Sequence, residues 1–396
     1  TPASAARFHL TRLAVFVAVP SLALGGHPYC TADEAAAKLI VWSLAAEICG
    51  FATMSGPLGA NHGLSTPLWF RLTPGTLKQP LLPGLPLLRS HIDIAVFCMY
   101  IASLAAALCA VGASQLTPRL RLSACLLSIL CILDRSAYSG SKGDYYWTLL
   151  MCLAWAGVGE AEGITALQLV QLAHLLIPGV AKLGPWFAHV LPFFLSLSPL
   201  VPSGQTRSLR YDTARAARVT FAREPPQANR EAFLPNARHL CPTFTAKLIA
   251  WLAGCTEVAV PILWCSERMS AFGVFLGCGM HISICLMLPP GAVLEWNAVN
   301  AALEVYLFGG CPHTAHGLLA ALGGLGMPLR VFVAVVSWVG PICGHVWPDA
   351  VSNTFAGRKC AARSYAPLYP LQPAINHPPT HANTHQHLFI ALQVHW

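Results

Sequence analysis

A stripe of polar side chains runs through an apolar segment in the last third of the chain. Asn297, Asn300 and Glu304 are spaced three and four residues apart, so on a helix they share one face. The surrounding run, residues 293–309, is long enough for most of a membrane crossing, and Glu295 lies near its start. Two amides and a carboxylate are costly in such a run unless they face a protein partner or water. The stripe therefore predicts a polar interior within a bundle of membrane helices.

Ionisable side chains in other apolar segments extend this candidate interior. A lone charge in hydrocarbon costs about 2.5–3.5 kcal/mol on insertion scales, so these groups are expected to pair or to become neutral. Lys182 can pair with Glu257 or with Glu295, and the sequence does not choose between them. The candidate set is Glu47, Lys182, Glu257, His281, Glu295, Asn297, Asn300 and Glu304.

Two roles are open for this set. A lysine or carboxylate held away from water can act as a general base, which would suit an enzyme acting on a lipid or another hydrophobic substrate. Buried polar groups also fix the packing of membrane helices without any turnover. The chain contains no phosphate-binding loop, nucleophile elbow, HExxH motif or dinucleotide fingerprint, so no catalytic residue is assigned.

One predicted helix carries a face of small residues. Gly273, Gly277, His281 and Cys285 recur every four residues, and Gly273 and Gly277 would let a neighbouring backbone or a flat ligand approach closely. A neutral imidazole at His281 can bind haem iron or the magnesium of a chlorophyll, but a hydrogen bond to a neighbouring helix is the commoner role. We therefore predict helix packing here, with a pigment or haem contact as the lesser alternative. No Cys-x-x-Cys pair occurs, no metal site is predicted, and no cofactor is identified.

Composition places the chain in a membrane. Hydrophobic residues make up 55% of it and charged residues only 10%, whereas a soluble domain has about a quarter charged residues. The apolar residues gather in blocks of roughly 17–25 residues, and the alternating polarity of a β-barrel is absent. We predict an all-α fold, a polytopic transmembrane helical bundle of about eight to ten membrane segments. The chain is thus an integral membrane protein, and the sequence does not say of which membrane.

The predicted organisation is one membrane domain and a tail. Residues 1–350 form the transmembrane domain, which includes a basic extramembrane loop at 203–245, and residues 351–396 form a Pro- and His-rich C-terminal tail. Residues 81–88 are apolar but broken by prolines, so they either lie along the membrane surface or re-enter it. The predicted segments are 8–24, 35–54, 92–111, 120–133, 145–158, 164–180, 186–201, 246–264, 271–288, 293–309 and 329–346.

The net charge of +8 is concentrated in the basic loop. Arg207, Arg210, Arg215 and Arg218 are expected to contact anionic lipid head groups or a partner on the positive side of the membrane. No nucleic-acid recognition motif accompanies these arginines, so nucleic acid is not an expected partner. Membrane lipids are the predicted partners, together with other membrane subunits.

Several short strings occur in the order found in a family of multi-pass membrane proteins. They are residues 55–58 (SGPL), 72–76 (LTPGT), 181–183 (AKL), 198–200 (SPL) and 294–297 (LEWN), with Pro348-Asp349 and Val351-Ser352 after the last span. Over residues 8–355 the chain resembles the domain-of-unknown-function 3556 family, which looks distantly similar to the transmembrane part of vitamin K-dependent carboxylase-like proteins. The resemblance implies a multi-pass membrane fold and carries no established activity. After about Arg358 the chain departs from the family pattern.

These observations favour a non-catalytic role as a subunit or scaffold of a larger membrane assembly. The absence of motifs, the glycine face and the many apolar segments fit this role. Two alternatives are a membrane-embedded enzyme that uses the carboxylate, lysine and histidine groups, and a transporter. Broken helices and intramembrane charges suit a transporter, but no internal repeat is evident.

Overall fold

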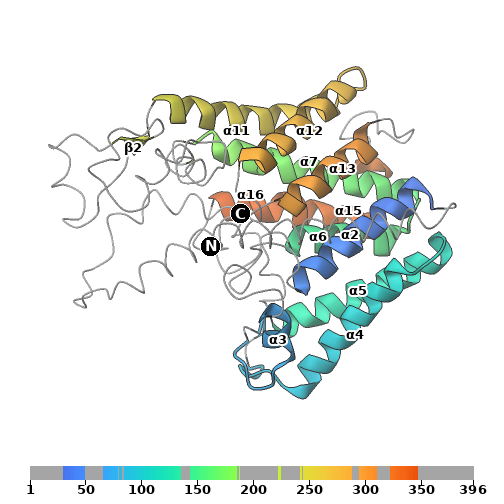
Figure 1. The fold of residues 1–396 in the computed structure, drawn as a ribbon. Coiled ribbons are helices and arrows are strands. Elements are labelled where there is room, and N and C mark those ends of the chain that lie inside the picture. Colours follow the sequence, from blue (N-terminus) through green and yellow to red (C-terminus); the bar gives the residue numbers. More distant parts are fainter. Residues whose placement is uncertain are drawn as a thin grey trace, which may run out of the picture.

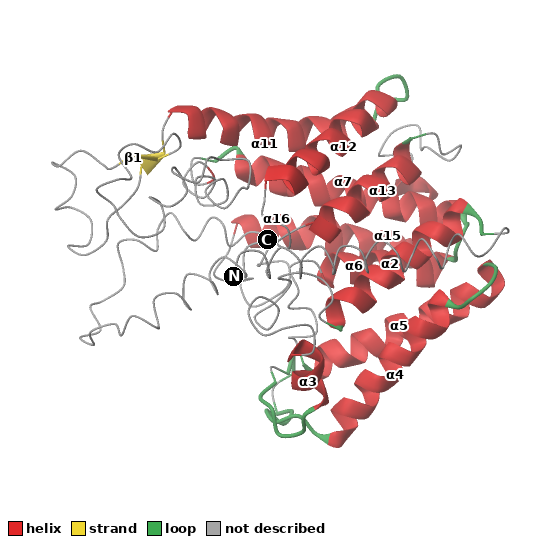
Figure 2. Cartoon of the chain, viewed as in Figure 1, coloured by secondary structure: helices red, strands yellow, loops and turns green. Residues whose placement is uncertain are grey.

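The protein is a bundle of helices that lie side by side (Figures 1 and 2). A computed structural model describes residues 30–49, 66–78, 80–82, 84–134, 143–184, 187, 222–223, 241–242, 244–287, 294–309 and 322–346. Within these residues the only strands are β1 (Ala222–Arg223) and β2 (Cys241–Pro242), a short antiparallel pair. The predicted all-α class is confirmed.

The helices follow the predicted apolar segments closely. They are α2 (Ala32–Ile48), α3 (Thr66–Leu72), α4 (His91–Leu108), α5 (Ala113–Leu133), α6 (Gly143–Ala156), α7 (Ala161–Lys182), α11 (Phe244–Trp264), α12 (Ser270–Met287), α13 (Leu294–Phe308), α15 (Met327–Val333), the π-helical stretch η3 (Ala334–Val339) and α16 (Gly340–Val346).

Four helices in the described part of the chain are long and apolar enough to cross a membrane. These are α4, α5, α7 and the Lys247–Trp264 part of α11, and shorter apolar helices cover Ser270–Cys285 and Met327–Cys343. The membrane-helix bundle is thus confirmed. The total of eight to ten crossings stays a prediction, because segment 8–24 and all of 186–201 except Phe187 lie outside the described residues.

Two predicted boundaries are wrong. Helix α2 ends at Ile48, whereas we expected the segment to continue to residue 54. We expected a short segment at 120–133, but α5 begins at Ala113 and has 21 residues. Arg119 donates from Nη1 to the carbonyl oxygen of Ala106 at 2.7 Å, and Arg121 donates from Nε to that of Ala154 at 2.8 Å. Because both arginines bond to carbonyls of neighbouring helices, α5 continues through them, whereas the hydrophobic pattern ends where the charges begin.

Helices α4 and α5 form a tight hairpin (Figure 1). Ser90 and Asp93 make a capping box at the start of α4, in which the Ser90 N–H donates to Asp93 Oδ2 at 2.6 Å and Ser90 Oγ accepts from the Asp93 N–H at 3.3 Å. Gly112 has φ +81° in the turn between the two helices, a conformation that glycine adopts without strain. Local chemistry therefore stabilises both the start of α4 and the turn between α4 and α5.

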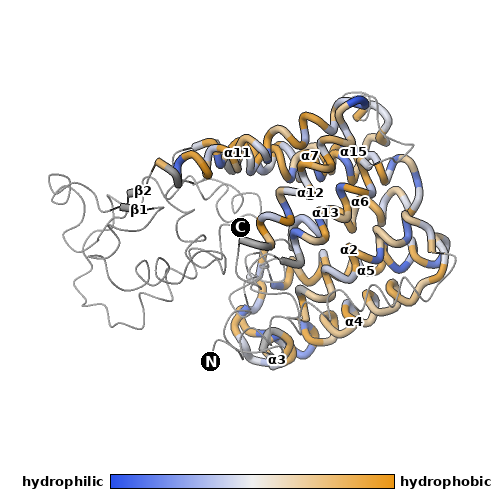
Figure 3. The backbone as a smooth tube through the Cα atoms, turned by 45° about the horizontal axis from the view of Figure 1, so that its top comes forward, coloured by the Kyte–Doolittle hydropathy of each residue, from blue (hydrophilic) through white to orange (hydrophobic). Residues whose placement is uncertain are grey.

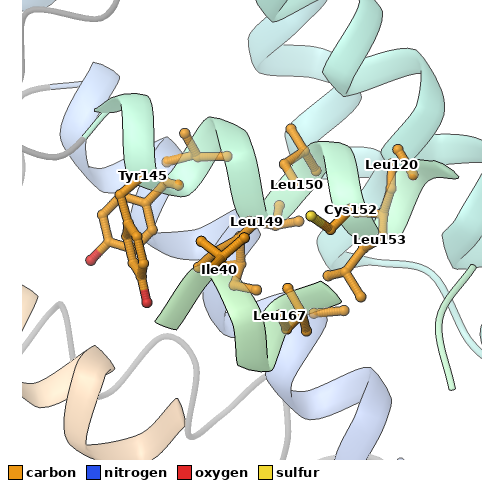
Figure 4. Packing of buried hydrophobic residues seen from close by; sticks show 14 of the residues in the cluster. Ile40, Leu120, Tyr145, Leu149, Leu150, Cys152, Leu153 and Leu167 are labelled. Carbon is orange, nitrogen blue, oxygen red and sulfur yellow. The ribbon is translucent and has the colours of Figure 1, made fainter. Parts of the chain in front are cut away.

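Helix α6 packs its apolar side chains against three neighbours. Figure 4 shows side chains of α6 beside residues from α2, α5 and α7. None of the labelled side chains is more than 4% exposed, and they are Ile40, Leu120, Tyr145, Leu149, Leu150, Cys152, Leu153 and Leu167. In Figure 3 the hydrophobic colour predominates along the helices. Many large apolar side chains are exposed, as a lipid-facing surface requires.

The last apolar segment is helical from Met327 to Val346, with a wide turn in its middle. Pro341 has no N–H to give to the carbonyl of Ser337 four residues earlier, and its ring would crowd that carbonyl. The helix instead widens to a π-helical register, in which the Gly340 N–H bonds to the carbonyl of Val335. The proline thus accounts for the position of η3.

Candidate functional site

The polar stripe of α13 faces the neighbouring helix α12. His281 of α12 lies between two stripe residues, with Nδ1 2.6 Å from Asn297 Oδ1 and Nε2 2.8 Å from Glu304 Oε1. His281 is 2% exposed and Glu304 is fully buried. The three side chains form one hydrogen-bonded unit, which we call the α12–α13 cluster.

The atoms that meet in this cluster require a proton between His281 and Glu304. The amide oxygen of Asn297 can only accept, so Nδ1 of His281 donates to it. The contact between Nε2 and Glu304 then needs its own proton, on the imidazole or on the carboxyl group. In both cases the pair carries no net charge, which suits its buried position.

Glycine makes room for the buried carboxylate. A Cβ atom at Gly277 would lie 3.0 Å from Cδ of Glu304 and 3.2 Å from Cγ1 of Val260. A Cβ atom at Gly273 would lie 3.0 Å from Cβ of Leu263 in α11. The two glycines thus lie at close contacts between α12 and its neighbouring helices.

A second polar group holds the middle of the stripe, and we call it the amide cluster. Gln171 of α7 donates from Nε2 to Asn300 Oδ1 at 2.9 Å, and Asn300 donates from Nδ2 to the Trp296 carbonyl at 2.9 Å. Tyr145 of α6 donates to Gln171 Oε1, and its hydroxyl lies 3.4 Å from Asn300 Oδ1. The cluster connects α6, α7 and α13.

Sequence inspection missed Gln171 and Tyr145. Gln171 had a usable signal, because Gln168 and Gln171 are two amides three residues apart in an apolar segment, as in the stripe itself. Tyr145 had none, because a tyrosine at the edge of an apolar segment is the ordinary pattern of a membrane interface.

Lys182 forms an ion pair with Glu257, one of the two partners that the sequence allowed. The pair joins α7 to α11, and the side chains of Lys182 and Glu257 are only 12% and 9% exposed. Gly179 faces Glu257 closely enough that an added Cβ would lie 2.9 Å from Cβ of Glu257. The candidate residues therefore form two groups, because this ion pair bridges α7 and α11 while the stripe bonds to α6, α7 and α12.

The remaining candidates cannot be assigned a contact. Glu47 lies in α2 and Glu295 in the first turn of α13, but their side chains fall outside the described part, as do Arg207, Arg210, Arg215 and Arg218. No group of three potential metal ligands occurs among the described residues. Both ring nitrogens of His281 are engaged within the protein, which leaves neither for haem or pigment.

A narrow cavity lies beside the amide cluster, between α6, α7 and η3. Its wall has no charged side chain and is formed by Tyr145, Thr148, Val170, Ala173, His174, Ile177, Pro178, Val336, Ser337 and Pro341. The ring of His174 packs 4.2 Å from that of Tyr145 and 4.5 Å from that of Trp296, measured between ring centres. The Ser337 hydroxyl is buried and has no hydrogen-bond partner among the described residues.

Comparison with known proteins identifies a family. A family model described as a transmembrane protein of unknown function (DUF3556) matches residues 35–378. No curated protein and no solved structure matches the chain. We expected the likeness to cover residues 8–355, but the match begins at residue 35 and continues to residue 378. The distant similarity to carboxylase-like proteins is not shown and stays a prediction.

Proposed function

The chain belongs to the DUF3556 family of transmembrane proteins, and on that premise we propose that it is a non-catalytic subunit or scaffold of a larger membrane assembly. One observation carries the proposal. Each of the three stripe residues is already hydrogen-bonded to a side chain of another helix: Asn297 and Glu304 bond to His281 of α12, and Asn300 bonds to Gln171 of α7.

Helix α13 is held from several directions. Besides the stripe contacts, its last turn receives hydrogen bonds at two carbonyls, from Gln168 Nε2 to Leu307 and from Ser270 Oγ to Phe308, each at 2.8 Å. Tyr306 donates to Asp33 of α2. Each such bond contributes about 0.6 kcal/mol on average between membrane helices, so together they hold α13 firmly against α2, α6, α7 and α12.

The state of His281 supports the same role. A general base or a metal ligand needs a ring nitrogen that can reach a substrate or an ion. In this protein both nitrogens are occupied, and the side chain is 2% exposed. The imidazole therefore acts here as a connector between Asn297 and Glu304.

The test replaces the connector without leaving a charge behind. In the double variant His281→Leu/Glu304→Met, two apolar side chains of similar size fill the same space, a replacement that is often neutral for a buried ion pair. Asn297 loses one hydrogen bond in this variant, at a cost of about 1–3 kcal/mol. If the chain is non-catalytic, this variant should accumulate in the membrane and should restore the normal phenotype to a strain that lacks the chain. Ser283→Ala, on an exposed side of α12, is the matched control. Normal accumulation with failed rescue would overturn the proposal.

A second candidate is a membrane enzyme that moves a proton on a hydrophobic substrate. It is favoured by Oε2 of Glu304, which is buried without a hydrogen-bond partner among the described residues, beside the proton shared with His281. Glu304→Gln keeps the shape of the side chain but removes the carboxylate. The enzyme candidate predicts a stable Glu304→Gln protein that fails to rescue and changes the lipid profile of the membrane. The transporter alternative stays a prediction without a contact that favours it.

A further inference from the structure

A short hairpin leads into α4. We call the described residues from 75 to 92, which include the first two residues of α4, the leucine hairpin. Leu77 and Leu88 pair in an antiparallel bridge, and the Lys78 N–H donates to the Leu87 carbonyl at 2.8 Å. The Leu81 N–H donates to the carbonyl of Ile132 near the end of α5, at 2.9 Å. The hairpin is thereby attached to the ends of α4 and α5, beside α3, where Figure 2 shows loop residues in green.

The apolar side chains of the hairpin point outward. All of the following are more than half exposed: Leu77, Leu81, Leu82, Leu87, Leu88 and Ile92. Keeping a leucine in water rather than in an apolar environment costs about 1.5–3 kcal/mol. Several exposed leucines on one short hairpin therefore indicate a surface that another apolar phase covers.

The charged side chains of the same region point inward. Lys78 pairs with Asp93 at 2.6 Å, and Arg89 pairs with Asp134 at 2.5 Å, with all four side chains at most 8% exposed. Burial lowers the pKa of Arg89 from its usual range, and the carboxylates of Asp134 and Asp93 act in the opposite direction. The large apolar side chains of the hairpin are thus exposed, whereas its charged side chains are buried in ion pairs that carry no net charge.

This inversion has a physical meaning. On a surface that faces water, Lys78 and Arg89 would extend into solvent and avoid a desolvation cost of several kcal/mol per ion. In contact with lipid, an exposed lysine or arginine is the costly arrangement, and a buried ion pair with a carboxylate becomes favourable. Both the exposed leucines and the buried pairs therefore indicate a hydrocarbon environment.

We propose that the leucine hairpin inserts shallowly into the membrane and that lipid acyl chains cover its leucines. Apolar side chains are also exposed on the two spans to which the hairpin is attached, namely Ile92 and Met99 of α4 and Ile129 and Ile132 of α5.

The depth follows from the backbone. Non-helical backbone is not tolerated in the centre of a bilayer unless protein covers it. The hairpin satisfies part of its backbone through the bridge and through the bond to Ile132, so it fits at the boundary between head groups and acyl chains, about 5–10 Å deep. On this proposal, residues 81–88 lie along the membrane surface rather than re-entering the membrane.

The test places a genetically encoded fluorescent amino acid at position 82 of the full chain in phosphatidylcholine vesicles. Met99 is the matched control, since Leu82 and Met99 are 52% and 51% exposed, and Met99 lies about 12 Å along α4 from its first residue. The vesicles carry a spin-label quencher either near the lipid head group or near the end of the acyl chain, and iodide quenches from water.

At position 82 the proposal predicts the larger loss of fluorescence with the head-group-proximal quencher, and at position 99 with the deep quencher. Stronger quenching of position 82 by iodide than by either lipid would show a water-exposed hairpin. Protection from all three quenchers would show that protein covers it. Stronger quenching by the deep label would show full re-entry. Each of these three results would overturn the proposal.

Discussion

Replacing Gly277 by alanine adds one methyl group at the most crowded contact of the α12–α13 cluster. The new Cβ would lie 3.0 Å from Cδ of Glu304 and 3.2 Å from Cγ1 of Val260, both closer than ordinary van der Waals contact. Because Glu304 is fully buried, its carboxylate has no open space to move into. Overpacking of this kind costs about 1–3 kcal/mol, and loss of the His281 contact would bring the cost toward 3–5 kcal/mol.

Gly279 supplies a control in the same helix. No atom lies within 4 Å of a Cβ built there, so Gly279→Ala gains helix propensity of up to about 1 kcal/mol without a clash. The two variants have the same composition and differ only in what the methyl group meets. Unfolding in mixed detergent and SDS micelles, followed by helical circular dichroism, compares their free energies of unfolding. Equal stabilities for the two alanine variants would refute the packing that places Glu304 against Gly277.

Three further predictions concern the other polar groups, and the same unfolding assay checks them. Lys182→Met leaves the Glu257 carboxylate unpaired and should lower the free energy of unfolding by about 3–5 kcal/mol, whereas Lys182→Met/Glu257→Leu should recover most of the loss; equal losses would argue against the ion pair. Asn300→Leu removes the acceptor of Gln171 and should cost about 1–3 kcal/mol, and a neutral effect would argue against the amide cluster. Ser337→Ala removes a buried hydroxyl without a described partner and should be neutral or stabilising by up to about 1 kcal/mol; a clear loss of stability would reveal a bonded hydroxyl.

Much of the architecture could be predicted because membrane helices leave a strong hydropathy signal. The segments predicted at 164–180 and 271–288 became α7 and α12 with ends shifted by three residues or fewer. The error at α5 has a clear origin, because Arg119 and Arg121 interrupt the apolar pattern while their side chains bond to carbonyls of other helices. A hydropathy pattern includes the cost of a charged side chain in the membrane but not the hydrogen-bond partner that offsets this cost.

The contacts between the candidate site residues could be predicted only in part. The spacing of Asn297, Asn300 and Glu304 identified a shared face, and burial in the structure agrees with it. Their partners lie on helices distant in sequence, so neither the choice of Glu257 by Lys182 nor the role of Gln171 follows from local spacing. The placement of residues 81–88 could not be predicted either. Our proposal for them depends on the buried pairs of Lys78 with Asp93 and Arg89 with Asp134, which the sequence does not reveal.

The central claim is that this chain is a non-catalytic part of a larger membrane assembly. The most direct measurement is the native mass of the chain extracted from its own membrane in polymer-bounded lipid discs. We predict a complex well above the 42.3 kDa of one chain, with other chains in a fixed ratio that the variant His281→Leu/Glu304→Met preserves. A single copy surrounded only by lipid would contradict the claim.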